Sequence, residues 1–311
     1  MRAVTIRAGS LVVADLADPV PGAGEVLIAV RAAGINNADL MQRAGNYPAP
    51  PGSPADIPGL ELAGEVAALG AGATRFEVGD RVMAVVGGGG QAELAVVHER
   101  LAMPVPAGMS WEEAGAVPEV WTTAHDALFS QCGLGLGERT CISAAAGGVG
   151  TAAVQLAVAA GARVTATVRN PDMRAGVAQL GASVVDPGAM ADHGPYDVIL
   201  ELIGAPNLGD DVDALAVGGR IAVIGMGGGS KGELDLAGLL SRRGRILGST
   251  LRSRPLEDKA RAARAMESHV LPLFDGRCRP LVAATFPLAC AEEAYERFAA
   301  GAKLGKIVLT T

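Results

Sequence analysis

The chain has few cysteines and no surplus of basic residues, and each shortage excludes a class of protein. Its 311 residues include four cysteines, of which no two have C-x-x-C spacing: Cys132, Cys141, Cys278 and Cys290. We therefore expect reduced, mostly buried thiols in a cytoplasmic protein, not a disulfide framework. The formal net charge is −7 and acidic and basic residues are interspersed, so nothing indicates a nucleic-acid partner.

We also expect no segment that would direct the chain to a membrane or out of the cell. Residues 1–7 contain no apolar core of a secretory signal. Residues 141–162 carry no charge and are long enough to cross a bilayer, but their glycines and alanines make them only weakly hydrophobic. Because 50% of the residues are hydrophobic and 19% are charged, we expect a soluble globular protein without a membrane partner.

The chain does contain a glycine turn between a short apolar strand and an Ala-rich helix. The strand covers residues 139–143, the turn covers 144–150, and the helix follows. Such a turn lets the backbone approach a pyrophosphate, whose charge is stabilised by free N–H groups and by the helix dipole. Ala145 replaces the first glycine of the G-x-G-x-x-G pattern. The turn still predicts a nucleotide site formed by Ala146, Gly147, Gly148, Val149 and Gly150.

The pattern of the sequence changes near residue 110. Before it, short strands at 25–31, 62–69 and 80–86 are separated by Gly and Pro, as in a small β-barrel. After a capping box at Ser110, strands and helices alternate, which is typical of a parallel sheet covered on both faces. The final residues resemble strands that return to the first domain. We predict an α/β fold, with a doubly wound Rossmann domain at 120–255 and a β-barrel substrate domain at 1–119 and 256–311.

The alternation also predicts individual elements of the second half. Strands are expected at 140–143, 163–168, 183–185, 196–202, 219–224 and 245–250, and helices at 151–160, 171–180, 208–216, 234–241 and 257–274. The segment between Val185 and Tyr196 is short and rich in Gly and Pro, so no crossover helix is expected there.

Motifs over nearly the whole length resemble one family. They lie at residues 34–43, 47–48, 58–61, 79–80, 87–92, 118–124, 144–150, 225–229, 251–254 and 304–309. Together they resemble the zinc-independent quinone oxidoreductases of the medium-chain dehydrogenase/reductase superfamily, most closely the p53-inducible type. The resemblance implies a GroES-like substrate domain beside the Rossmann domain, NADPH as the hydride donor, and a homodimer.

Two positions argue against a catalytic zinc ion. Zinc-containing members of the superfamily have Cys where this chain has Asn36, and His where it has Leu60. Neither Asn nor Leu supplies the sulfur or nitrogen ligand that Zn²⁺ prefers, and Asp39 with Glu61 alone would be a poor donor set. We expect no metal. Without a Lewis acid, the acceptor must already be electron-poor, such as a quinone or an activated alkene.

The end of the strand at 163–168 favours NADPH over NADH. An NAD-specific site has Asp or Glu about 20 residues beyond the turn, where it binds the ribose 2′-OH. Here that strand is followed by Arg169, and no carboxylate precedes it. A guanidinium can bind a 2′-phosphate with two hydrogen bonds, and Arg174 is a second candidate. The alternative for both arginines is a solvated surface charge.

The remaining cofactor-binding candidates lie beyond the carboxyl ends of strands, where ligands of such sheets bind. They are Gly225, Met226 and Gly227 after one strand and Leu251 and Arg252 after another, and the resemblance adds Lys306. For the glycines, a plain turn is the alternative. Glu201, near the end of an apolar strand, is either a buried acid near the cofactor or a solvent-facing residue.

The resemblance further implies three catalytic residues. Asn36 would stand near the nicotinamide ribose and the acceptor, Tyr47 would form an aromatic lip over the quinone, and Thr123 would lie beside the carboxamide. A turn-forming Asn and a helix hydroxyl bonded to its own backbone are the alternatives for Asn36 and Thr123.

These residues predict an NADPH-dependent oxidoreductase that transfers hydride to a quinone. Reduction of the double bond of an α,β-unsaturated carbonyl compound or enoyl thioester is an alternative, and so is a protein that binds NADPH without turnover. The sequence offers no obvious general acid, so we expect the proton to come from water or from the semi-open site of the quinone.

Overall fold

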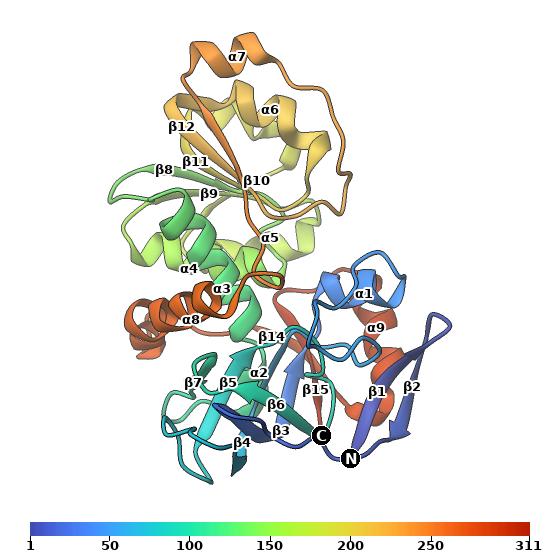
Figure 1. Ribbon diagram of the computed structural model, residues 1–311. Helices are drawn as coiled ribbons and strands as arrows, with labels where there is room; N and C mark the ends of the chain where they lie inside the picture. The colour runs from blue at the N-terminus through green and yellow to red at the C-terminus, as the bar shows by residue number, and fades with distance from the viewer.

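Two β-sheets, one in each lobe, organise the computed structural model, which describes residues 1–311 (Figure 1). The upper sheet has six parallel strands in the order β10 (Ser183–Val185), β9 (Arg163–Thr167), β8 (Arg139–Ile142), β11 (Tyr196–Glu201), β12 (Leu215–Val223) and β13 (Arg245–Gly248). This strand order, 3-2-1-4-5-6 in sequence, is that of a Rossmann fold. The predicted α/β class is therefore confirmed.

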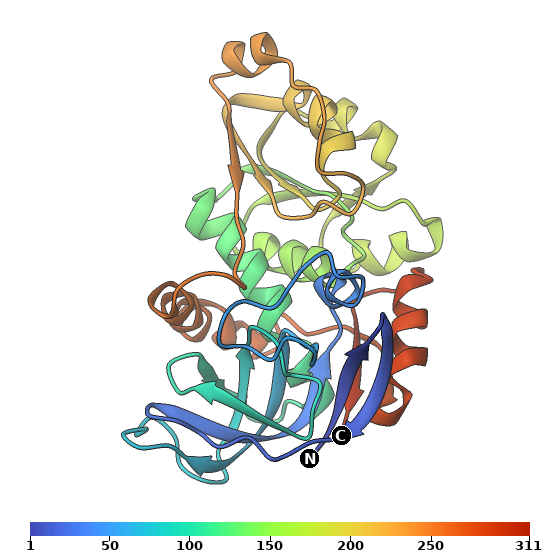
Figure 2. The same cartoon turned by 45° about the vertical axis from the view of Figure 1, so that its right-hand side comes forward.

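The lower sheet draws strands from both ends of the chain. Its order is β14 (Val282–Pro287), β15 (Lys306–Thr310), β3 (Glu25–Gly34), β4 (Glu61–Leu69), β5 (Arg81–Val85) and β7 (Ala102–Pro104), and β6 (Leu94–His98) pairs with β3. The predicted return of the C-terminal strands is confirmed, because Val308 of β15 pairs with Gly34 of β3. A hairpin of β1 (Arg2–Arg7) and β2 (Ser10–Asp15), which the sequence analysis does not predict, packs beside α9 (Ala291–Ala299) (Figure 2).

Helices lie in both lobes, and α3 joins them (Figure 1). They are α1 (Asn37–Arg43), α2 (Trp111–Gly115), α3 (Pro118–His125), α4 (Gly148–Ala159), α5 (Pro171–Ala178), α6 (Leu208–Asp213), α7 (Leu236–Ser241) and α8 (Leu256–Ala265). The capping box at Ser110 is confirmed, because its hydroxyl accepts the N–H of Glu113 and its own N–H donates to the Glu113 carboxylate. Two short 3₁₀ turns, Pro187–Ala189 and Ala191–His193, replace a crossover helix before β11, as predicted.

Two predicted helices are wrong in extent. The helix expected to reach residue 216 ends at Asp213, because Leu215 is fully buried and pairs with Tyr196 as the start of β12. The helix expected over 257–274 is regular only to Ala265 and continues as a π turn and a 3₁₀ turn. Pro272 lies in that last turn, where it cannot donate the backbone hydrogen bond of a regular helix.

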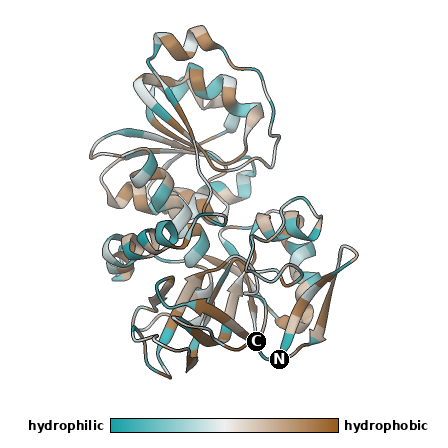
Figure 3. Cartoon of the chain, viewed as in Figure 1, coloured by the Kyte–Doolittle hydropathy of each residue, from teal (hydrophilic) through white to brown (hydrophobic).

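The apolar cores lie on the sheets and on the helix between them. Figure 3 shows hydrophobic residues concentrated in the strands of both lobes. The largest buried cluster includes Trp121 of α3, Val154 of α4 and Ile142 of β8. Because α3 packs on α4 and also on β4 and β5, this helix fixes one lobe against the other. None of the helices combines the length and the hydrophobicity that a membrane span requires.

Candidate functional site

A cleft of about 900 Å³ lies between the lobes and receives residues from both. The Rossmann side contributes the glycine turn and the ends of β11 and β12, and the lower lobe contributes α1 and the loop after it. Most of the predicted site residues line it: Asn36, Tyr47, Thr123, Gly147, Gly148, Val149, Gly225, Met226, Gly227, Leu251, Arg252 and Lys306. Residues that are far apart in sequence thus share one cavity.

The glycine turn has the form that an anion cradle needs. Ala144 adopts a left-handed conformation (φ 47°), and Gly147 precedes the first turn of α4 in extended backbone. The N–H groups of Gly148, Val149 and Gly150 have no backbone acceptor. A Cβ on Gly150 would lie 2.5 Å from Ala145 Cα, so only glycine lets the helix pack this closely. These N–H groups and the helix dipole together favour an anion at this place.

The turn also contacts the lower lobe directly. The N–H of Gly305 donates to Ala146 O at 2.9 Å. Of the predicted residues of the turn, Ala146 and Gly150 are not among those that line the cleft. A Cβ on Gly148 would lie 2.6 Å from Lys306 Cδ and 2.9 Å from Val120 Cγ1. The start of β15 therefore lies against the start of α4.

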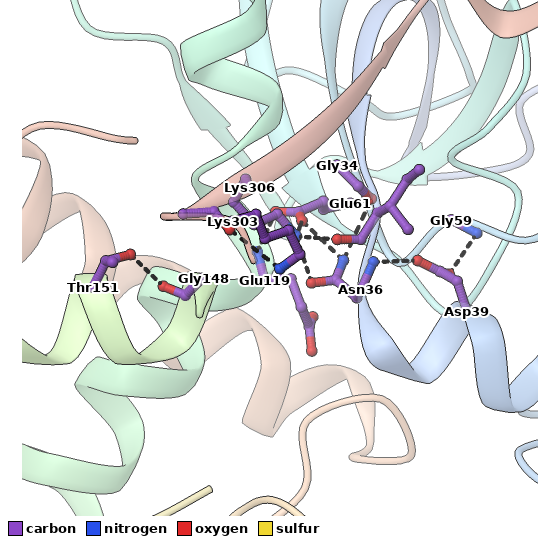
Figure 4. Close-up of polar contacts among 12 residues, drawn as sticks. Gly34, Asn36, Asp39, Gly59, Glu61, Glu119, Gly148, Thr151, Lys303 and Lys306 are labelled. Atoms are coloured by element: carbon purple, nitrogen blue, oxygen red, sulfur yellow. Dashed lines mark hydrogen bonds and ion pairs between the residues drawn. The ribbon is translucent and has the colours of Figure 1, made fainter. Parts of the chain in front are cut away.

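A cluster of four polar side chains, Asn36, Asp39, Glu61 and Lys306, lies on the lower-lobe side of the cleft, where Asn36 and Lys306 line it (Figure 4). The Lys306 ammonium group donates to Ile35 O at 2.7 Å and to Asn36 Oδ1 at 2.6 Å, and it lies 2.7 Å from Glu61 Oε1. Asn36 Nδ2 donates to Glu61 Oε1 at 2.9 Å. Glu61 and Lys306 are almost completely buried, and mutual pairing offsets their desolvation.

Asp39 ties this cluster to the backbone. Its carboxylate accepts the N–H of Asn36 at 2.8 Å and of Gly59 at 3.0 Å. Complete burial nevertheless raises the pKa of Asp39 to about 6. Asn36 has its side-chain amide engaged on both sides, so the proposed contacts of Asn36 with a ligand compete with Lys306 and Glu61.

Glu119, at the start of α3, is a cleft residue that the sequence analysis does not single out. Its backbone N–H donates to Glu61 Oε2 at 2.8 Å, but its side-chain oxygens accept no hydrogen bond, and Oε2 is enclosed. Figure 4 shows the side chain pointing away from the polar cluster. Burial and the charge of Glu61 raise the pKa of Glu119 to about 8.

Tyr47 and Arg252 form the outer part of the cleft. The Arg252 guanidinium donates to Gly87 O, Tyr47 O and Gln42 Oε1, at 2.8, 2.9 and 2.5 Å. Its Cζ atom also lies 5.0 Å from the centre of the Tyr47 ring. Arg252 is expected from the sequence to bind the cofactor; in the structure, three of its N–H groups hold Gly87, Gln42 and the loop that carries Tyr47. Arg252 therefore positions Tyr47.

The loop after β12 is fastened through Glu201. This side chain is fully buried, so the solvent-facing alternative is wrong. Its carboxylate accepts the N–H groups of Ile203 and Gly204 and the Asn207 amide. Its carbonyl accepts the N–H of Gly225 at 3.2 Å. Glu201 thus holds the loops that present Gly225, Met226 and Gly227 to the cleft, without reaching the cleft itself.

The two arginines near the end of β9, Arg169 and Arg174, differ in whether their guanidinium groups have partners. Arg174 donates to Val168 O at 3.0 Å and to Asp186 at 2.6 Å, so its guanidinium is already bound. Arg169 is exposed and has no hydrogen-bond or ion-pair partner. Neither arginine is among the residues that line the cleft.

Lys303 is a second cleft residue missed by the sequence analysis. Its ammonium lies 4.2 Å from the centre of the Phe298 ring. Burial and the neighbouring Lys306 lower the pKa of Lys303 to about 8. Its position next to the motif at residues 304–309 is the only sequence signal that marks it.

Comparison with known proteins gives two family matches. Residues 22–107 match the alcohol dehydrogenase GroES-like domain, and residues 148–268 match the family described as zinc-binding dehydrogenase. The cleft does not offer the donors that zinc prefers, because no three His, Cys, Asp or Glu side chains come together to hold a metal ion.

Individual relatives cover almost the whole chain. The quinone oxidoreductase of Rattus norvegicus is 30% identical over 307 residues, which are 95% of this chain and 92% of the relative. Crystal structures of the quinone oxidoreductase from Thermus thermophilus, one of them with NADPH, match with a TM-score of 0.87, 33% identity and 100% of both chains. The polyketide synthase GfsB of Streptomyces halstedii is 34% identical over 295 residues, which are 92% of this chain and 5% of that protein.

Proposed function

Because this chain belongs to the medium-chain dehydrogenase/reductase superfamily, we propose that it is a zinc-independent oxidoreductase that uses NADPH to reduce a quinone. One observation carries the proposal: a glycine turn whose N–H groups at residues 148–150 have no protein acceptor lies at a cleft of about 900 Å³, and no cluster of metal ligands forms there. The sequence relatives that are quinone oxidoreductases support the class of acceptor.

The chain's own residues fit a dinucleotide. The N–H groups of Gly148, Val149 and Gly150 would hold the pyrophosphate, and Arg169, which has no other partner, would meet the 2′-phosphate. Bound NADPH would supply the hydride. Thr123, Met226 and Leu251 would orient the nicotinamide ring and exclude water from it.

Zinc independence is supported by the donor set. Leu60 has no donor atom, and the Asn36 amide is bound to Lys306 and Glu61. A cation at this place would also be repelled by the Lys306 ammonium. We expect less than about 0.1 zinc ion per chain when protein purified without added metal is analysed, and unchanged turnover after chelator treatment.

A second candidate is reduction of the double bond of a conjugated carbonyl compound. Two observations favour this second candidate: the sequence similarity extends to a polyketide synthase, and Glu119 places a carboxyl group in the cleft. Initial rates of NADPH oxidation with 1,4-naphthoquinone, an ortho-quinone and a series of 2-alkenals rank the two candidates directly.

The decisive experiment measures binding and turnover separately. NADPH and NADH are titrated against the protein by calorimetry, and each acceptor is then tested for oxidation of bound NADPH. Binding without turnover would favour an NADPH-binding protein instead of an enzyme, and no binding would contradict the whole proposal. A homodimer in the cytoplasm belongs to the same proposal, and light scattering on the eluting protein tests its oligomeric state.

A further inference from the structure

Two acidic residues line the cleft, and they differ in what surrounds their carboxyl groups. Asp126 is bound by Arg254 through two hydrogen bonds, at 3.0 and 2.6 Å, and also by Ser249. Glu119 has no such partner: no protein group donates to either carboxyl oxygen, and Oε2 is shielded from solvent. A carboxylate with one oxygen shielded from water and no protein donor is costly, whereas the neutral acid is tolerated.

The charged groups around Glu119 do not neutralise it. Those nearest are Glu61 on β4, Asp39 on α1, Lys306 on β15, Arg252 after β13 and Lys259 on α8. The Lys306 ammonium is committed to Glu61 and Asn36, and the Arg252 guanidinium to the loop around Tyr47. Burial and the carboxylate of Glu61 therefore dominate, and they raise the pKa of Glu119 to about 8.

The position of Glu119 on α3 directs it to the reacting centre. Glu119 and Thr123 are four residues apart on one helix, so they lie on the same face, and both line the cleft. Figure 4 shows Glu119 between Gly148 of the turn and Asn36 of the polar cluster, with its carboxyl group directed into the space between the lobes.

We propose that Glu119 is the acid that donates the proton to the acceptor during reduction. This role rests on the proposed reductase function. After hydride addition the acceptor is an enolate or a hydroquinone anion. The O–H bond of Glu119 breaks as a C–H or O–H bond forms on that anion, and the Glu119 carboxylate then recovers its proton from water. The acceptor thus gains one hydride and one proton.

The first test is the pH dependence of turnover. Wild-type kcat should be constant at low pH and fall as pH rises through about 8, where Glu119 loses its proton. Glu119→Gln should lower kcat by about 100-fold at pH 7, since general acids contribute roughly 10²- to 10⁴-fold, and should remove the alkaline decline. Glu119→Asp should restore part of kcat and the decline. Glu112→Gln, on the neighbouring helix α2 and outside the cleft, is the matched control.

The second test needs neither cofactor nor acceptor. Glu119 has a pKa of about 8 when folded and an ordinary value of 4.5, so the folded state keeps a proton that the unfolded state releases. The wild-type protein should therefore lose thermal stability relative to Glu119→Gln as pH rises from about 4.5 to about 8, with a constant difference above that. A difference in Tm that does not change with pH would contradict a protonated Glu119.

The outcomes separate this inference from the proposed function. If the wild-type enzyme reduces an acceptor and Glu119→Gln keeps the same kcat and pH profile, Glu119 is not the acid, although the reductase function stands. A change confined to KM or to NADPH affinity would likewise overturn proton donation in favour of a positioning role. If the wild-type protein fails to oxidise NADPH in the presence of every acceptor tested, the proposed function fails, and the acid role of Glu119 fails with it.

Discussion

The polar groups on the two sides of the cleft differ in whether they have partners inside the protein. In the cluster of Asn36, Asp39, Glu61 and Lys306, buried charges are paired inside the protein. In the glycine turn, the N–H groups of residues 148–150 have no protein acceptor, and Gly148 and Val149 line the cleft. Buried charges must be paired because desolvation is costly, while groups at a cleft can be solvated until an anion replaces the water. The polar cluster therefore contributes a fixed structure, and the glycine turn contributes free N–H groups that can bind an anion.

Replacing Lys306, the cation of the polar cluster, should have the largest effect on stability. Lys306→Met leaves Glu61 buried without its ion-pair partner, and we expect a loss of about 3–5 kcal/mol in the free energy of unfolding. Urea unfolding measures it. Lys231→Met, at an exposed lysine without a hydrogen bond or ion pair, should change stability by less than about 0.5 kcal/mol. An unchanged midpoint in Lys306→Met would show that the polar cluster does not depend on this pair.

A smaller loss of stability should follow from adding a methyl group in the tightly packed glycine turn. Gly150→Ala puts a Cβ within 2.5 Å of Ala145 Cα and 2.7 Å of Ala144 O, so the turn or α4 must shift. Overpacking of this kind costs about 1–3 kcal/mol, and NADPH binding should weaken at the same time. Gly209→Ala in α6, where nothing lies within 4 Å, is the control and should be neutral or slightly stabilising. Equal stability of the two variants would contradict the close packing.

The affinities for NADPH and NADH should distinguish Arg169, which has no partner, from Arg174, whose guanidinium is bound. We expect Arg169→Ala to weaken NADPH about 10- to 100-fold and NADH little, because a charge-assisted hydrogen bond contributes about 1.5–3 kcal/mol. Arg174→Ala should change NADPH affinity less than about threefold, since its guanidinium already binds Val168 O and Asp186. Calorimetric titration of both nucleotides measures this, and equal losses of NADPH and NADH in Arg169→Ala would remove Arg169 from the phosphate site.

The smallest effect is expected at the outer part of the cleft. The Tyr47 hydroxyl lies 3.5 Å from Thr250 Oγ1, a weak contact, so Tyr47→Phe should alter the KM for a quinone less than about twofold. Tyr47→Ala removes the ring and should raise that KM about tenfold, the equivalent of about 1.4 kcal/mol. A large effect of Tyr47→Phe would mean that the hydroxyl, and not the ring, meets the acceptor.

The residues that sequence reasoning found and those that it missed differ in physical kind. The glycine turn could be predicted because its function depends on local backbone geometry between a strand and a helix. Glu119 could not, because its significance depends on what lies around it: Glu61 and Asp39 come from distant segments, and no donor reaches its side chain. Arg252 was placed at the cleft correctly, but its hydrogen bonds to Gly87 and Tyr47 exist only in the folded chain.

The sequence by itself determined the alternation of strands and helices in the second half and the turn that can hold a phosphate, because both follow from local patterns; the family resemblance marked Asn36 and Leu60 as positions without zinc ligands. Only the tertiary structure decided which polar groups are paired and which are free. Pairing depends on contacts between β3, β4, β15 and α3, and the free energy of a buried charge depends on those neighbours.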